Sequence, residues 1–323
     1  MSVDKNIFLD KDVSLSLIKD KKIAIIGYGN QGRAQALNLN DSGLNIIVGL
    51  RDESKSINQA KRDGIKVLNI SKAVEWADLI CLLVSDKIAP EVYNKHIDSH
   101  LSDGKTLLFS HGYNIYYKKI NIDKTIDIIM VAPSAGGAVV REKYKEGYGV
   151  PTLLAVERDS SGFALETAKS YSKAIGGTRV CAFISTFKEE TETDIFGEQA
   201  ILTGGLPYLI NSSYNTLIEK GYDSTVAWFV CYYEVKTIVD LFYNKGFEEF
   251  YSLISDTARY GGISRGKKLI DDKFDLKLAS MLEDIKSGKF NEDLSQYIDD
   301  GKSPKSFKNL EDKTKEMLNL IKE

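Results

Sequence analysis

The sequence predicts an α/β N-terminal domain with a doubly wound, Rossmann-type sheet, followed by an all-α C-terminal domain. Three observations predict this organisation. Short apolar runs alternate with helical segments in the first half, a glycine-rich turn follows the first run, and long amphipathic stretches take over afterwards. A chain of 323 residues can form two domains with a sizeable core, and we place them at residues 1–183 and 184–323.

The first apolar run, residues 21–26, is rich in β-branched residues and predicts a buried strand. It leads into a glycine-rich turn, Gly27-Tyr28-Gly29-Asn30-Gln31-Gly32, and a helical stretch follows to about Asn40. A strand, such a turn and a helix in this order bind the pyrophosphate of a dinucleotide. Gly27 would permit the tight turn, Gly29 the approach of the pyrophosphate, and Gly32 the close packing of helix on strand.

The second apolar run, residues 44–50, ends where a Rossmann domain distinguishes NADPH from NADH. Side chains that could hold the 2′-phosphate of NADPH follow it, namely Arg51, Ser54, Lys55 and Ser56. The carboxylates of Asp52 and Glu53 lie in the same loop, and they would repel that phosphate or accept a hydrogen bond from a free ribose 2′-hydroxyl. The sequence therefore predicts NADPH, with NADH as the alternative.

Further short runs complete the predicted sheet, at residues 67–70, 79–84, 106–109, 126–132, 151–156 and 180–184. The amphipathic stretches of the second half predict helices at residues 190–202, 206–220, 224–243, 248–260 and 276–287. The tail, residues 291–323, is highly charged, and its Lys and Glu runs predict a helix with a solvated face.

Composition excludes several classes of partner. The net charge is −3, and the 43 basic and 46 acidic residues are well mixed, which argues against nucleic acid or an anionic membrane as a partner. No apolar run approaches the ~18 residues that span a bilayer. The cysteines Cys81, Cys181 and Cys231 lack metal-ligand spacing, and their odd number fits a reducing compartment. We therefore expect a cytoplasmic protein that acts on a small molecule.

Carboxylates in the second half predict a site for a hard cation. Asp194 and Glu198 are four residues apart, so on a helix they share one face and can reach the same Mg²⁺ ion. Glu234 lies in a later helical stretch, where the position four residues earlier is Val230. The chain thus has one complete i, i+4 pair of carboxylates and one carboxylate, Glu234, without such a partner. This pattern predicts either a weakened two-metal reaction or simpler chemistry.

At four segments the chain resembles the short, class I ketol-acid reductoisomerases. They are the glycine turn 27–32, Ser110-His111-Gly112-Tyr113-Asn114-Ile115, the segment 189–199 that begins Glu-Glu-Thr-Glu-Thr-Asp, and Ile254-Ser255-Asp256-Thr257-Ala258. The resemblance implies an enzyme that takes 2-acetolactate or its ethyl homologue, uses two magnesium ions for an alkyl shift, and reduces the resulting 2-keto acid with NADPH. It also implies a knotted helical domain that forms a homodimer with shared active sites.

The resemblance assigns roles to residues that match the family's motifs. Asp194 and Glu198 stand at magnesium-ligand positions, and Glu234 at that of a metal-binding carboxylate from the partner subunit. His111 matches a catalytic histidine beside the nicotinamide, so the expected catalytic residues are His111, Asp194 and Glu234. Ser255 matches a hydroxyl that contacts the substrate carboxylate. All six residues of the glycine turn, with Gly137, are expected to contact the cofactor.

The chain departs from the family at two substrate-binding positions. Val230 stands where the family usually has Glu, and Ser134 stands where it has Lys; a nearby His is also absent. Valine cannot ligate a cation, and the alkyl shift depends on two metals more than reduction does. Our main hypothesis is therefore an NAD(P)H-dependent reductase of a 2-keto acid or related carbonyl or imine, with impaired or lost alkyl migration. The alternatives are an authentic ketol-acid reductoisomerase and a non-catalytic nucleotide-binding protein.

Overall fold

The computed structural model describes residues 6–297 and 302–322 of the chain. It divides into two compact units, Met1–Thr191 and Glu192–Glu323. This division lies inside helix α8, Phe187–Gly197, whereas the sequence places the domain boundary just before that helix. Because α8 is continuous, one element carries the chain from the first unit to the second. No helix in the described ranges is both long and apolar enough to cross a membrane.

The first unit is built on a nine-stranded sheet in the order β1-β9-β8-β7-β6-β5-β2-β3-β4. Neighbours from β7 through β4 run parallel, whereas β8 is antiparallel to β7 and β1 is antiparallel to β9. The strands are β1 Ile7–Phe8, β2 Lys22–Ile26, β3 Asn45–Leu50, β4 Val67–Asn69, β5 Leu79–Leu82, β6 Thr106–Phe109, β7 Asp127–Pro133, β8 Thr152–Arg158 and β9 Ala182–Ile184. The predicted mostly parallel, doubly wound sheet is confirmed.

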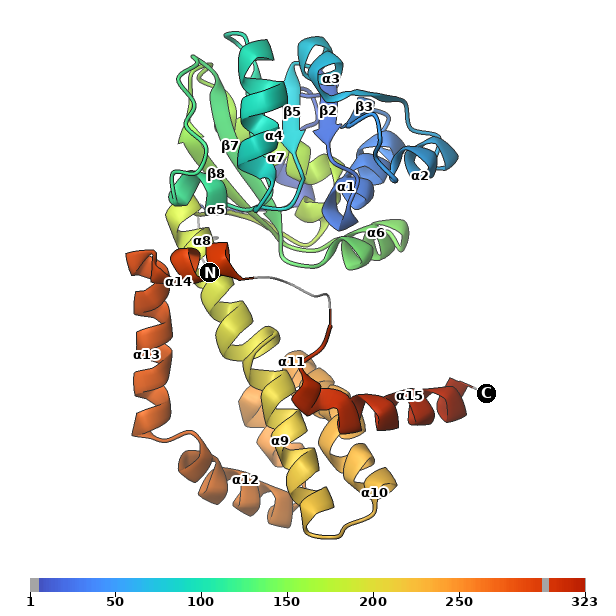
Figure 1. The fold of residues 1–323 in the computed structure, drawn as a ribbon, viewed down its shortest axis with the longest axis vertical. Coiled ribbons are helices and arrows are strands. Elements are labelled where there is room, and N and C mark those ends of the chain that lie inside the picture. The colour runs from blue at the N-terminus through green and yellow to red at the C-terminus, as the bar shows by residue number, and fades with distance from the viewer. Residues whose placement is uncertain (1–5, 298–301, 323) are drawn as a thin grey trace. The chain divides into compact units, whose positions relative to one another are not determined.

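Helices cover both faces of this sheet (Figure 1). Successive strand residues point to opposite faces, so Val48 joins one core and Ile47 the other. The first core includes side chains of α1, Asn30–Asp41, α2, Ile57–Arg62, and α7, Ala164–Ala174. The second includes side chains of α3, Ile70–Trp76, and α4, Ala89–Val92. The remaining helices of this unit are α5, Tyr113–Tyr116, and α6, Gly137–Lys145, the latter packed on α1.

The second unit is helical in the residues that the structure describes. After α8 come α9 Gly205–Glu219, α10 Ser224–Trp228, α11 Glu234–Leu253, α12 Asp256–Leu269, α13 Asp272–Ser287, α14 Lys289–Gln296 and α15 Lys308–Lys322. Short π-helical segments, Glu198–Leu202 and Phe229–Tyr233, follow α8 and precede α11. The all-α prediction is confirmed, whereas the implied knot stays a prediction.

One predicted helix, residues 248–260, is wrong because the chain breaks within it. Helix α11 has a kink at Gly246, whose φ is 73°, and then continues to Leu253. The next helix starts afresh, because the Oγ of Ser255 accepts a hydrogen bond from the backbone N–H of Ala258 at 3.2 Å. A serine in this position is a favourable N-cap, and it ends any continuation of the preceding helix.

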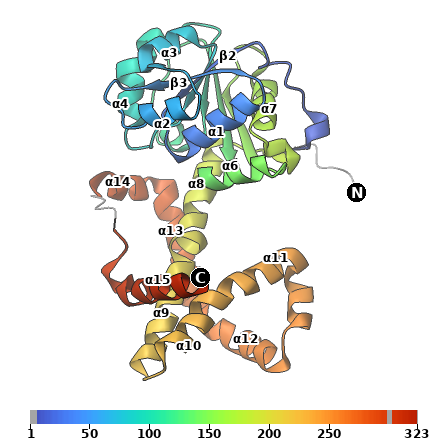
Figure 2. The ribbon, with the colours of Figure 1, turned by 90° about the vertical axis from the view of Figure 1, so that its right-hand side faces the viewer.

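The charged tail contains the predicted helix, and one face of this helix is part of a core. Leu310 and Met317 of α15 are buried with Trp228 of α10 and Tyr214 of α9, and Figure 2 shows the three helices together. The Nε1–H of Trp228 donates to Thr314 Oγ1 at 3.0 Å. Apolar residues seven positions apart lie on one helix face, and in α15 this spacing is hidden among Lys and Glu.

Replacing Leu310 by Ala should destabilise the second unit, because it leaves a cavity beside Trp228. The expected loss in the free energy of unfolding is about 2–4 kcal/mol, measured by urea denaturation at fixed protein concentration. Leu320 lies on the same helix but is 62% exposed, against 6% for Leu310. Leu320→Ala is thus the matched control and should cost less than about 0.5 kcal/mol. Equal losses in the two variants would contradict the assigned core.

Candidate functional site

A cavity of about 220 Å³ opens at the carboxyl ends of β2, β3 and β5. Between β2 and β5 the strand order reverses, and ligands of doubly wound sheets bind in the crevice at such a point. The cavity is lined by predicted cofactor residues from two loops: Gly27, Tyr28, Gly29, Arg51, Ser54 and Ser56. The structure thus brings together residues that are nearly thirty positions apart in the sequence. We call this cavity the dinucleotide pocket.

The glycine turn under this pocket needs glycine for steric reasons. Gly27 has φ 105°, in the left-handed region, and a Cβ there would lie 2.5 Å from the carbonyl oxygen of Leu83. A Cβ on Gly32 would lie 2.5 Å from the carbonyl oxygen of Gly27. Helix α1 therefore starts in direct contact with the turn, as the sequence predicts. No atom lies within 4 Å of the corresponding point on Gly29, which leaves space above the turn.

Tyr28 is anchored by a charged pair next to the pocket. Its hydroxyl donates to Asp63 Oδ2 at 2.9 Å, and Arg33 donates to both oxygens of that carboxylate at 2.7 and 3.0 Å. The hydrogen bonds from Arg33, the largest cause, together with those from Tyr28 and Gln59, lower the pKa of Asp63 from 3.8 to about 2. Burial, and then the Asp63 carboxylate, raise the pKa of Tyr28 above its usual value.

The side chains of the loop after β3 line two neighbouring cavities. Arg51, Ser54 and Ser56 line the dinucleotide pocket, whereas Asp52 and Glu53, again with Arg51, line a neighbouring cavity of about 430 Å³. Asp52 Oδ1 accepts a hydrogen bond from Asn69 Nδ2 at 3.0 Å. Three of the four groups suited to a 2′-phosphate therefore line the pocket, whereas Lys55 lines neither of these two cavities. The carboxylates that would oppose that phosphate lie in the adjoining space.

His111 is held by a residue that the sequence analysis did not single out. Its Nδ1 lies 2.9 Å from Glu190 Oε1, and the backbone N–H of Gly112 donates to Glu190 Oε2 at 2.8 Å. Glu190 belongs to α8 and is only 4% exposed. Its carboxylate therefore fixes both the imidazole ring and the turn that follows. Because Glu190 precedes Asp194 by four residues, the same i, i+4 spacing that identified Asp194 and Glu198 would have found it.

Two of the three predicted metal ligands lie at or directly after a π-helical segment. Asp194 is exposed on regular α8, whereas Glu198 begins the π-helical segment Glu198–Leu202. Glu234 is also exposed and begins α11, directly after the π-helical segment Phe229–Tyr233. π-Helical segments frequently occur at functional sites. The i, i+4 comparison of Val230 with Glu234 assumes α-helical spacing. The structure has a π-helical turn between these two residues, so that assumption does not hold there.

The predicted substrate residues are all at least partly accessible in the isolated chain. Val230 is 49% exposed, and Ser134 is exposed in the loop after β7, where its backbone N–H donates to the carbonyl oxygen of Pro151 at 2.9 Å. Ser255 is exposed as well, and its hydroxyl caps α12. The capping bond gives Ser255 a structural role besides the predicted contact with substrate.

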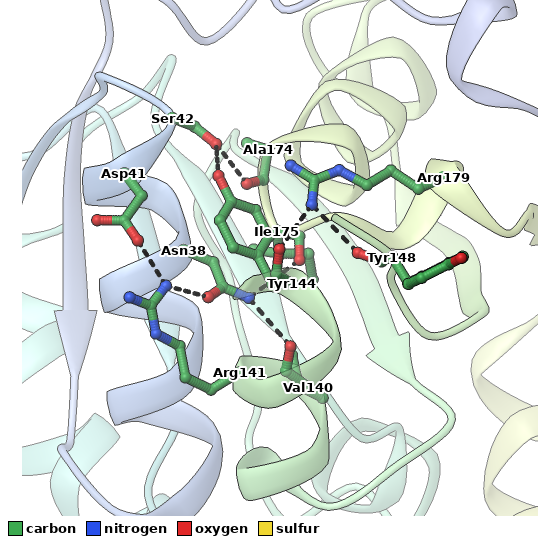
Figure 3. Close-up of polar contacts among 10 residues, drawn as sticks. All are labelled: Asn38, Asp41, Ser42, Val140, Arg141, Tyr144, Tyr148, Ala174, Ile175 and Arg179. Carbon is green, nitrogen blue, oxygen red and sulfur yellow. Dashed lines mark hydrogen bonds and ion pairs between the residues drawn. The ribbon is translucent and has the colours of Figure 1, made fainter. Parts of the chain in front are cut away.

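Helix α6 is fastened to α1 along its length (Figure 3). Arg141 of α6 donates to Asn38 Oδ1 at 2.8 Å and pairs with Asp41 at 2.6 Å. One turn further along α6, the hydroxyls of Tyr144 and Ser42 lie 2.8 Å apart. These contacts fix the helix that follows the loop containing Ser134.

The start of α6 touches the glycine turn itself. A Cβ on Gly137 would lie 2.0 Å from the carbonyl oxygen of Asn30, so glycine is required by close approach. Gln31 points to the same loop, where its Nε2 donates to the carbonyl oxygen of Ala135 at 2.8 Å. Gln31, Gly32 and Gly137 thus shape the site through packing and hydrogen bonds. Their predicted contacts with cofactor stay predictions.

The Asp63 cluster predicts an acid-dependent change in stability. A carboxyl whose pKa is lowered by folding stabilises the native state fully above its unfolded pKa, and this stabilisation disappears as the pH falls through the folded value, about 2. Asp63→Asn should therefore reduce the free energy of unfolding at about pH 6 by about 1 kcal/mol, since Arg33 is nearly half exposed and solvent screens the pair. Urea denaturation at about pH 6 and about pH 2 should show this difference shrinking. A difference that stays constant would contradict the assignment.

Two neighbouring glycines give a matched test of the contact between α6 and the glycine turn. Gly137→Ala should lower the melting temperature and weaken dinucleotide binding, because the new methyl group pushes the loop away from Asn30. Gly136→Ala should have a smaller effect on both, since no atom lies within 4 Å of its Cβ position and only the N-cap of α6 is altered. Melting curves and titration of nicotinamide fluorescence measure the two effects. Equal melting temperatures and equal dinucleotide affinities in the two variants would show that the contact of Gly137 with Asn30 contributes to neither property.

Two family models match successive parts of the chain. Residues 17–181 match the family model of the acetohydroxy acid isomeroreductase NADPH-binding domain, and residues 187–320 match that of the ketol-acid reductoisomerase C-terminal domain. The chain is 49% identical over 289 residues to the ketol-acid reductoisomerase (NADP(+)) of Methanocaldococcus jannaschii, covering 90% of this chain and 88% of the relative. It is also 49% identical over 286 residues to that of Petrotoga mobilis, covering 88% and 87%.

The fold is also similar to that of a solved ketol-acid reductoisomerase. The NADH-preferring ketol-acid reductoisomerase from an uncultured archaeon superposes with a TM-score of 0.86 at 40% identity, covering 90% of this chain and 89% of that one. A semialdehyde dehydrogenase NAD-binding protein from Cupriavidus necator, 15% identical with a TM-score of 0.64, shares the fold alone. The two family models together span nearly the whole chain. The chain therefore belongs to the ketol-acid reductoisomerase family of oxidoreductases.

Proposed function

We propose that this protein is an NADPH- and Mg²⁺-dependent ketol-acid reductoisomerase that converts 2-acetolactate to 2,3-dihydroxyisovalerate. The observation that carries the proposal is the dinucleotide pocket, where Arg51, Ser54 and Ser56 gather beside the glycine turn. The relatives' printed names, which specify NADP(+), support the same activity. This is the alternative to our main hypothesis from the sequence, and the comparisons favour it over a reductase with lost alkyl migration.

The residues present fit both cofactors. The glycine turn would hold the pyrophosphate, and Arg51 with the two serines would hold the 2′-phosphate of NADPH. Asp194, Glu198 and Glu234 offer the carboxylate oxygens that Mg²⁺ prefers. When bound, Mg²⁺ would polarise the substrate carbonyl, and NADPH would supply the reducing equivalents.

His111 is suited to hold a proton in this reaction. A carboxylate bonded to Nδ1 orients the imidazole ring, favours the proton on Nδ1, and stabilises the imidazolium form. Glu190 is buried, so the carboxylate end of its bond to His111 is shielded from water, whereas the His111 side chain is 25% exposed. His111 would therefore exchange a proton with the substrate, while Glu190 keeps the ring in place. The same pair would serve either the full reaction or reduction alone.

Exposed apolar side chains support a homodimer with shared active sites. None of the described residues in α11 or α12 is buried, and the large exposed side chains on or near them include Tyr243, Phe247, Tyr260, Ile263 and Leu276. Such surfaces mark protein interfaces, and a second copy of this chain would cover them. Glu234, at the start of α11, could then serve the partner's site.

The free cysteines Cys81, Cys181 and Cys231 support a reducing, cytoplasmic location.

A second candidate function is reduction without alkyl migration. It is favoured by Val230, which offers no oxygen to a cation, and by Ser134, which carries no charge. The two departures remove one carboxylate and one ammonium group compared with the family pattern. A site with fewer charges would be less able to stabilise the alkoxide of the alkyl shift than to support reduction.

The two functions are separated by offering two substrates with NADPH and Mg²⁺. The full enzyme should oxidise NADPH with 2-acetolactate and with 3-hydroxy-3-methyl-2-oxobutanoate, which is the product of the alkyl shift and needs only reduction. Absorbance at about 340 nm follows the reduced nicotinamide, and chelation of Mg²⁺ should stop turnover of 2-acetolactate. Turnover of the second compound alone would establish reduction without alkyl migration. No NADPH oxidation with either compound would reject both candidate functions.

One variant shows whether the missing carboxylate limits the reaction. Val230→Glu should raise kcat with 2-acetolactate by about tenfold or more if the lost ligand limits the alkyl shift, and should leave reduction of the second compound nearly unchanged. Val226→Glu is the matched control, because Val226 is also exposed and lies one helical turn earlier. A higher kcat with 2-acetolactate in both variants would show that added surface charge, and not metal binding, causes the increase.

A further inference from the structure

Helix α1 carries a row of polar side chains on the face that packs against the rest of the first unit. The row consists of Gln31, Gln35 and Asn38, and Ser42 extends it at the C-cap of the helix. Asn38 Nδ2 donates to the carbonyl oxygen of Ile175 at 3.1 Å, and Ser42 Oγ donates to that of Ala174 at 2.7 Å (Figure 3). Gln35 and Asn38 are fully buried. Polar groups so deeply buried need hydrogen-bond partners, so their positions determine which neighbours fit.

Gln35 connects three segments that are distant in the sequence. Its Oε1 accepts from the hydroxyl of Tyr171 at 2.8 Å. Its Nε2 donates to Ser110 Oγ and to Gln31 Oε1, both at 3.0 Å. Gln31 in turn donates to the carbonyl oxygen of Ala135. A single amide thus links α7, the end of β6 and, through Gln31, the loop before α6.

The segments that Gln35 connects carry the proposed site. Ser110 directly precedes His111, which Glu190 holds through Nδ1. Ala135 lies between Ser134 and Gly137, in the loop that touches the glycine turn. We propose that Gln35 is a positioning residue that holds the His111 segment and the loop at residues 134–136 in one mutual arrangement. This inference rests on the proposed function, since it concerns the same site.

Gln35 can fix these segments because leaving a buried amide group without hydrogen-bond partners costs free energy. If Ser110 or Gln31 moved, the fully buried amide of Gln35 would lose a hydrogen-bond partner, and the cost of leaving it unpaired opposes the movement. The arrangement of the two segments is therefore enforced by the amide and not only by packing. An apolar side chain of equal length would fill the same space without enforcing it.

The test compares Gln35→Met with Tyr171→Phe. Methionine retains the length of the side chain but removes all three hydrogen bonds, whereas phenylalanine removes only the Tyr171 hydroxyl and leaves both donor bonds of Gln35. Both variants should lower the melting temperature. Only Gln35→Met should lower kcat, by about tenfold or more, with KM for NADPH changed less than about threefold.

Amide hydrogen exchange gives a readout that does not depend on turnover. Gln35→Met should speed exchange at residues 110–114 and 134–138, and Tyr171→Phe should not. Equal kinetics and equal exchange in the two variants would overturn the proposal and leave Gln35 a structural residue. If the wild-type protein turns over neither substrate, the proposed function fails, and the exchange experiment still decides whether Gln35 positions these segments.

Discussion

Helix α1 has to approach the first strand closely enough to present its N-terminus to a phosphate, and the other parts of the site depend on this approach. The turn at Gly27 and the contact between Gly32 and Gly27 make the approach sterically feasible. The start of α6 then packs on the outside of the same turn through Gly137. A displacement of α1 would therefore change the pocket, the loop before α6 and the segment leading to His111 together.

The first unit combines charged contacts at its surface with neutral ones inside. Arg33 and Asp63 hold Tyr28 at the edge of the pocket, where solvent reduces the strength of an ion pair. Deeper in the unit, Gln35 and Asn38 use amide groups that bring no charge into the core. The buried Glu190 is an exception, since its two oxygens are engaged by His111 and Gly112. This carboxylate stays buried because it is hydrogen-bonded to the site it orients.

Much of the fold could be predicted from the sequence because local patterns report local structure. Runs of β-branched residues indicated most of the strands, and the glycine turn indicated the pocket at the end of β2. The predictions missed contacts between residues that are distant in the sequence, and they also missed one local break. The charged tail gave no sign that Leu310 and Met317 pack on Trp228, and the break before α12 arises from the cap at Ser255. The π-helical segments beside Glu198 and Glu234 were likewise not predicted, because no simple periodicity distinguishes them from α-helix.

By itself the sequence determined the fold class, the glycine turn, the loop that gathers Arg51, Ser54 and Ser56, and the family, because each depends on residues that are neighbours along the chain. Only the tertiary structure decided that Glu190 holds His111, that Asp52 and Glu53 line a space beside the dinucleotide pocket, and that Gln35 joins Ser110 to the loop before α6. Those contacts join segments far apart in the chain. They depend on how the strands are ordered and how α1, α6 and α7 pack, and no local pattern of residues records that arrangement.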